Sequence, residues 1–156
     1  MELKTKVSAE VGKQELVITR NFDLPLKLLF KAYEDPVLVE QWMGTKVLKL
    51  ESKRHGSYQY ETKDAEGNVI FKANGVIHEF LPELKITRTF EMENTPLGVQ
   101  LEFYEFEKLT GNTSKLKMHV IYESVAQRDQ VLKMPFAQGL NMAHNRLEEI
   151  IKKLIS

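Results

Sequence analysis

The chain has 156 residues, in which 22 Lys and Arg balance 22 Asp and Glu, and it contains no cysteine. This length fits one domain that buries a core without metal or disulfide crosslinks. The lack of cysteine excludes disulfides, thiolate nucleophiles and cysteine-ligated zinc. The balanced charge shows no basic stripe, which argues against nucleic acid as a partner.

No apolar run approaches the ~20 residues that a membrane span needs. The first residues alternate charged and apolar side chains, unlike the apolar core of a signal peptide. We therefore expect a cytoplasmic protein with a single domain over residues 1–156. Residues 1–11 are expected to form either a short extra strand or a flexible arm.

The first regular element expected is a strand over Glu15–Phe22, because β-branched and apolar residues alternate there. Two short helices follow this strand. Pro25 suits the first position of one helix, and Asp35-Pro36 provides the N-cap and first residue of the next. Gly44 is placed to end the second helix in the left-handed conformation.

Residues 45–123 predict one strand after another, separated by short turns, which is typical of an antiparallel meander. Gly67 supplies the positive φ of one hairpin loop, and Thr110-Gly111-Asn112 forms a later turn. The expected strands cover residues 46–51, 57–63, 69–80, 84–92, 99–109 and 115–122.

The C-terminal segment carries the clearest helical pattern. Ser124 with Gln127 predicts a capping box, and Pro135 interrupts the helix that follows. A long helix is expected from about Pro135 to Leu154, because apolar residues recur there at spacings of three and four. Such a helix is roughly 30 Å long and crosses a small domain.

Together the elements predict an α+β fold, in which a curved antiparallel sheet of six to seven strands wraps round the C-terminal helix. The sheet has one apolar face to bury, and the helix has one apolar stripe. The simplest arrangement lays this stripe along the concave face of the twisted sheet, while the two short helices close one end.

A series of short motifs, spread over nearly the whole chain from residue 12, resembles one protein superfamily. The motifs lie at residues 12–25, 30–36, 41–42, 55–58, 74–79, 89–90 and 123–125. Their order resembles that of the SRPBCC superfamily (START and Bet v-like proteins). Within it, the chain most resembles the branch named after the activator of the heat shock protein 90 ATPase. The resemblance implies the helix-grip fold.

Three positions depart from the pattern of this branch. His55 stands where glycine is frequent, Thr45 where proline is frequent, and Leu140 where tryptophan often follows Gly139. The leucine changes what lines the groove between sheet and helix. The identity of a ligand therefore does not follow from the resemblance.

Aromatic and methionine side chains come from several elements that surround this groove. One helix cannot fill a deeply curved sheet everywhere, so we expect a cavity near its N-terminal half, where Gly139 removes side-chain volume. Small-molecule sites are usually apolar cavities with a few polar groups. The competing interpretation is that these side chains simply form the core. The candidate ligand-binding residues are Trp42, Tyr58, Tyr60, Phe71, His78, Phe90, Phe103, Met118, Phe136 and Leu140.

The sequence contains no clear catalytic or metal-binding motif, and we expect no catalytic residues, metal or cofactor. His144 and Glu148 are four residues apart and could supply two metal ligands, but an ordinary surface interaction is the simpler interpretation. A carboxylate inside an apolar groove could act as acid or base. Strand glutamates that could point inward, although such residues more often face solvent, are Glu79, Glu102 and Glu105.

Three functions stay open at this stage. The leading hypothesis is that the protein binds a small apolar or amphipathic molecule in the cavity. The resemblance implies a second, a co-regulator that binds a chaperone or another stress-response partner. The third is a cyclase- or hydrolase-like enzyme, which a buried glutamate with a histidine or arginine partner in the cavity would favour. A homodimer through the sheet edge or the N-terminal arm also stays open.

Overall fold

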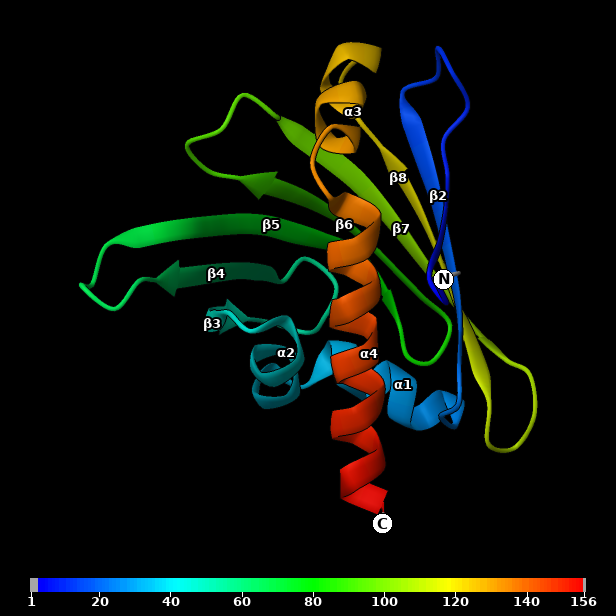
Figure 1. Cartoon of the computed structure of the whole chain (residues 1–156). Helices are drawn as coiled ribbons and strands as arrows, with labels where there is room; N and C mark the ends of the chain where they lie inside the picture. The colour runs from blue at the N-terminus through cyan, green and yellow to red at the C-terminus, as the bar shows by residue number, and fades with distance from the viewer. Residues whose placement is uncertain (1–2, 156) are drawn as a thin grey trace.

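The structure, a computed structural model, describes residues 3–155, which form one curved sheet and four helices (Figure 1). The strands are β1 (Lys6–Ser8), β2 (Glu15–Phe22), β3 (Lys46–Leu50), β4 (Ser57–Lys63), β5 (Val69–Leu81), β6 (Lys85–Met92), β7 (Val99–Lys108) and β8 (Ser114–Ile121). The helices are α1 (Leu26–Glu34), α2 (Pro36–Met43), α3 (Val125–Leu132) and α4 (Phe136–Ile155).

The sheet has the strand order β1-β2-β8-β7-β6-β5-β4-β3, and all neighbouring strands are antiparallel. The expected meander from β3 to β8 is thereby confirmed. Within the described residues the sheet has eight strands instead of six to seven, because Lys6–Ser8 pairs with the outer edge of β2.

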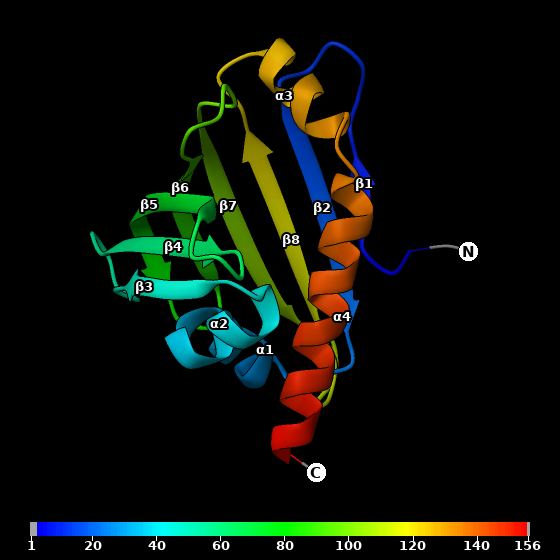
Figure 2. The same cartoon turned by 60° about the vertical axis from the view of Figure 1, so that its left-hand side comes forward.

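Helix α4 lies across the concave face of the sheet, while α1 and α2 close one end and α3 lies at the other (Figures 1 and 2). The expected helix-grip arrangement is confirmed. Leu147 and Ile151 of α4 are buried with the core residues of β2. Leu154 was expected to continue this stripe but is 59% exposed. None of the described helices is long and apolar enough to cross a membrane.

Local hydrogen bonds explain where the short helices begin and end. The Asp35 side chain accepts a hydrogen bond from the backbone N–H of Val37, and Gly44 ends α2 with a φ of 69°. Ser124 caps α3 by accepting from the backbone of Gln127. The cap at Asp35, the helix end at Gly44 and the cap at Ser124 are confirmed. The Gln127 side chain accepts from the Ser124 hydroxyl, not from its backbone N–H as a capping box would have it. Pro25 is the N-cap of α1 and not its first helical residue, so the helix begins one position later than predicted.

His55 occupies the tight turn before β4 with a φ of 68°. In this left-handed region a side chain with a Cβ is strained and glycine is not. This geometry is the physical reason why a glycine suits the position better than the histidine found here.

Candidate ligand-binding pocket

A pocket of about 270 Å³ lies between the concave face of the sheet and the N-terminal half of α4. Side chains from all four described helices and from β2, β4, β6, β7 and β8 line it. Its inner end is buried, and its rim is formed by partly exposed apolar side chains such as Met43, Leu97 and Met134. A cavity of about 150 Å³ is known to hold benzene, so this pocket has room for about two fused rings.

Six of the ten candidate residues line the pocket. They are Trp42, Tyr60, Phe90, Met118, Phe136 and Leu140. Tyr58 lies directly behind this lining: it is fully buried, its ring centre is 5.1 Å from that of Tyr60, and its hydroxyl donates to the carbonyl of Thr89. Phe71 packs half-buried against the core near the hairpin end of β5, outside the lining.

The other two candidates, Phe103 and His78, have side chains on the outer side of the sheet. Side chains alternate along β7, and Glu102 and Tyr104 face inward, so Phe103 faces outward, where its ring centre is 5.9 Å from that of His119. His78 is exposed because it follows the buried Ile77 in β5. We therefore leave both residues out of the proposed site.

Gly139 does not create the space in the pocket, contrary to expectation. It is exposed on α4, and a Cβ built on it would meet no atom within 4 Å. The residues of α4 that border the pocket include Leu140 and Ala143.

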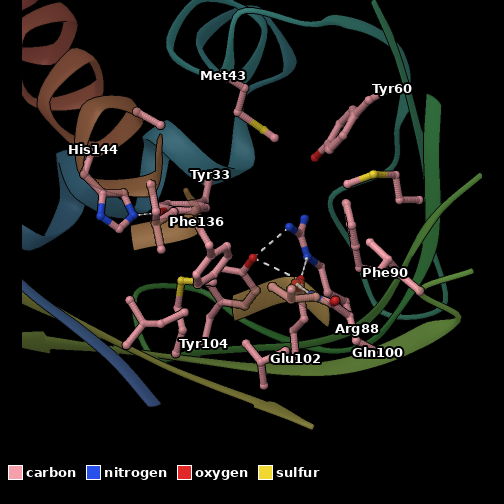
Figure 3. A pocket seen from close by; sticks show the side chains of 18 of the residues that line it. Tyr33, Met43, Tyr60, Arg88, Phe90, Gln100, Glu102, Tyr104, Phe136 and His144 are labelled. Carbon is pink, nitrogen blue, oxygen red and sulfur yellow. Dashed lines mark hydrogen bonds and ion pairs between the residues drawn. The ribbon is translucent and has the colours of Figure 1, made fainter. Parts of the chain in front are cut away.

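Sequence reasoning missed Arg88, Gln100 and Tyr104 and favoured a solvent-facing Glu102. Glu102 is in fact 4% exposed and lines the pocket. Arg88 of β6 lies directly opposite it on β7, and its Nε donates to Oε1 of Glu102 over 2.9 Å. Tyr104 accepts from Nη2 of Arg88 at 2.8 Å and donates to the same Oε1 at 3.0 Å. Gln100 donates to Oε2 at 2.8 Å (Figure 3).

Two tyrosine rings support the guanidinium of Arg88. Its Cζ lies 4.5 Å from the ring centre of Tyr58 and 4.8 Å from that of Tyr104, distances typical of cation–π contacts. Gly75 makes room for Tyr58, because a Cβ at this position would overlap the Tyr58 hydroxyl and the Thr89 carbonyl oxygen. The glycine of β5 therefore helps to fix the arginine in the pocket.

Burial and charge determine the protonation of this cluster. Burial opposes the charged form of Arg88, but Tyr104, Tyr58 and Glu102 outweigh this effect and hold the pKa of Arg88 above its usual value. Burial also raises the pKa of the Tyr104 phenol well above its ordinary value. Tyr104 therefore keeps its proton and donates a hydrogen bond to Glu102.

His144 is a second buried polar group at the pocket, on α4. Its Nδ1 lies 2.8 Å from Oγ1 of Thr5, and its Nε2 lies 3.5 Å from the hydroxyl of Tyr33. Burial, and then the charge of Arg20, lower the pKa of His144 to about 3, so the ring is neutral at neutral pH. The expected surface interaction of His144 with Glu148 is wrong, because Glu148 accepts from Arg20 instead.

In the part of the chain that the structure describes, no group of three or more His, Asp or Glu side chains is arranged to hold a metal ion. The site is an apolar pocket that contains one ion pair, between Arg88 and Glu102, and one neutral histidine, His144. This arrangement suits the binding of an organic molecule.

Comparison with known proteins assigns the chain to a family. The family model described as "Activator of Hsp90 ATPase homolog 1-like protein" matches residues 23–152. The chain belongs to this family. The resemblance found in the sequence is therefore confirmed. A search of curated proteins finds no match to the chain.

Solved structures from several bacteria share the fold of this family member. Protein Ms6760 from Mycobacterium smegmatis is 22% identical, with 94% of this chain and 95% of that chain covered and a TM-score of 0.82. A protein from Rhodobacter sphaeroides is 18% identical, with 96% and 99% covered and a TM-score of 0.84. One from Arthrobacter aurescens is 18% identical, with 95% and 91% covered and a TM-score of 0.82. At these identities the likeness shows the fold.

Proposed function

We propose that the protein binds a small, mostly apolar molecule in the pocket between the sheet and α4. The observation that carries this proposal is the space that the side chains leave open. Protein interiors are close-packed and have few voids larger than one water molecule. The pocket measures about 270 Å³, nearly twice the ~150 Å³ of a cavity that holds benzene. A ligand of matching shape would gain the packing contacts that this space lacks.

The lining supports a ligand that is apolar over most of its surface. Phe90, Met118, Phe136 and Leu140 contribute apolar walls, and Arg88 with its partners contributes one polar region. Apolar walls with a few placed polar groups are the usual form of small-molecule sites. The lining also includes Met43, Met92 and Met134. Methionine side chains adapt to irregular shapes, so we expect the pocket to accept several related molecules.

The buried pair of Glu102 and Arg88 is the feature that would favour an enzyme. The hydrogen bonds that Glu102 already accepts from the protein argue against a role as a general base and support ligand binding instead. A general base must reach the proton that it removes. Both carboxylate oxygens of Glu102 already accept hydrogen bonds from Arg88, Tyr104 and Gln100. His144, with its pKa lowered to about 3, is a weak base at neutral pH.

Family membership suggests a second candidate function, the regulation of a chaperone ATPase through protein contact. The pocket favours ligand binding over this candidate, because a pocket of two-ring size is suited to a small molecule. The two functions predict different assays: only the second predicts a change in the ATP turnover of an Hsp90-type chaperone. We propose a cytoplasmic location, which the absence of cysteine suits.

A thermal-shift screen with two-ring aromatic compounds, terpenoids and medium-chain lipids, followed by calorimetric titration, tests the proposal. The informative variant is Leu140→Trp, which places a larger side chain in the pocket. The matched control is Met142→Trp, on the same helix but 59% exposed and outside the lining. We expect Leu140→Trp to weaken binding at least tenfold and Met142→Trp to leave it unchanged. A screen without any binder, or equal binding by both variants, would overturn the proposal.

A further inference from the structure

We propose that the pocket selects molecules that carry a neutral hydroxyl or carbonyl oxygen at the end that meets Arg88 and Tyr60. This inference rests on the proposed function, because it names the chemistry of the ligand that the same pocket would take. Two side-chain groups without a hydrogen-bond partner among the described residues carry it, together with the charge balance of the lining.

The first group is Nη1 of Arg88. The other two guanidinium nitrogens donate to Glu102 and Tyr104, whereas Nη1 donates to no residue that the structure describes. Nη1 is also accessible from the pocket. Among the described residues, Nε of Arg20 is the one buried side-chain nitrogen or oxygen that lacks a partner, so Nη1, which lacks a partner too, cannot be buried. Figure 3 shows the guanidinium directed into the open part of the pocket. Arg88 therefore offers a charged hydrogen-bond donor, Nη1, to a molecule bound in the pocket.

The second group is the hydroxyl of Tyr60, on β4. The residue is 1% exposed, yet its hydroxyl forms no hydrogen bond with any described residue and is not enclosed by protein. In Figure 3 this hydroxyl and the Arg88 guanidinium point toward the same space. The hydroxyl is therefore accessible from the pocket and free to donate to or accept from a bound molecule. One ligand oxygen placed between these two groups would serve both.

The charges of the lining favour an uncharged oxygen. Arg88 and Glu102 are the two charged residues that line the pocket, and their 2.9 Å ion pair cancels their net charge. His144, across the pocket on α4, is neutral and adds no positive charge. A carboxylate bound at Arg88 would lose its hydration and would also lie near Glu102. A hydroxyl or carbonyl gains a charge-assisted hydrogen bond without this loss.

Three ligands with the same two-ring skeleton test the inference: naphthalene, 2-naphthol and 2-naphthoate, titrated calorimetrically at pH 7. We expect 2-naphthol to bind about tenfold or more tightly than naphthalene, because a hydrogen bond to a charged donor is worth about one decade in affinity or more. We expect 2-naphthoate to bind no more tightly than naphthalene. This comparison uses the unaltered protein and does not depend on any variant.

Two variants assign the preference to the named groups. Tyr60→Phe removes a hydroxyl that has no hydrogen-bond partner among the described residues, so the fold should be unaffected. We expect it to reduce the preference for 2-naphthol over naphthalene about three- to tenfold through weaker binding of 2-naphthol alone. The double variant Arg88→Met with Glu102→Leu removes both charges together and should reduce the preference at least as much as Tyr60→Phe does.

The outcomes separate this inference from the proposed function. Equal affinities for naphthalene and 2-naphthol would overturn the inference and leave the proposed function standing. So would tighter binding of 2-naphthoate, or a preference for 2-naphthol that survives both variants. If none of the three ligands binds, and the wider screen also finds no binder, then the proposed function fails and the inference fails with it.

Discussion

Replacing Arg88 by methionine is expected to destabilise the protein by about 3–5 kcal/mol, because it leaves the Glu102 carboxylate buried without its cation. The side chains of Arg88 and Glu102 are only 11% and 6% exposed, so solvent screens the 2.9 Å pair weakly. Replacing both residues, with Arg88→Met and Glu102→Leu, removes the uncompensated charge. This double variant should recover most of the loss, since apolar side chains often substitute for a buried ion pair with little cost.

The assay is chemical unfolding of four proteins, namely wild type, both single variants and the double variant. Each free energy of unfolding is obtained by linear extrapolation from urea curves, after a check that the transitions are two-state. The cycle yields the coupling energy between the two residues. A loss below about 1 kcal/mol for Arg88→Met, the range of a surface ion pair, would refute the claim that a strongly coupled buried pair organises the pocket.

Two further predictions concern stability. Gly75→Ala should destabilise the protein by about 1–3 kcal/mol or more, because the new Cβ would overlap Tyr58 and the Thr89 carbonyl. Gly139→Ala, in open space on α4, should stabilise it by about 0.5–1 kcal/mol. Urea unfolding measures both changes, and similar effects of the two variants would contradict both predictions. Burial lowers the pKa of folded His144 to about 3, against 6.5 in the unfolded chain. The stability that it contributes should therefore fall by about 1.4 kcal/mol per pH unit as pH drops from 6.5 toward 3. Comparison with His144→Gln checks this, and parallel pH profiles would exclude it.

Elements with local signals could be predicted closely from the sequence. The N-cap at Asp35, the left-handed Gly44 and the Ser124 cap involve atoms within a few residues of one another, so the order of residues alone indicates them. Alternation in the strands and the helical spacing after Pro135 likewise gave the order of elements. That order allowed few packed arrangements, and the helix-grip fold is the one that the structure adopts.

The polar part of the pocket depends on contacts that are distant in sequence. Arg88 lies opposite Glu102 only because of the register between β6 and β7, which the connection over residues 93–98 sets and the sequence does not display. One usable signal was present: Glu102, Tyr104 and Phe106 alternate, and all three are buried. The usual exposure of strand glutamates points the other way and outweighs this alternation in a sequence-based prediction. The same alternation would have placed Phe103 on the outer face.

His144 shows the same limit on α4. It occupies the apolar stripe between Leu140 and Leu147, at spacings of four and three, so periodicity alone indicated burial. Burial of a histidine also requires a hydrogen-bond partner. That partner is Thr5, 139 residues earlier in the chain, and no pattern in the sequence connects the two.

The central claim is that a small molecule binds between the sheet and α4, and intermolecular NOEs test it most directly. In a complex with 2-naphthol, the ring protons should show NOEs to the methyl groups of Met118 and Leu140, which line the pocket. The exposed methyl groups of Leu154, at the far end of the same helix, should show none. NOEs to Leu154 and to other exposed methyl groups, with none to Met118 or Leu140, would contradict the account.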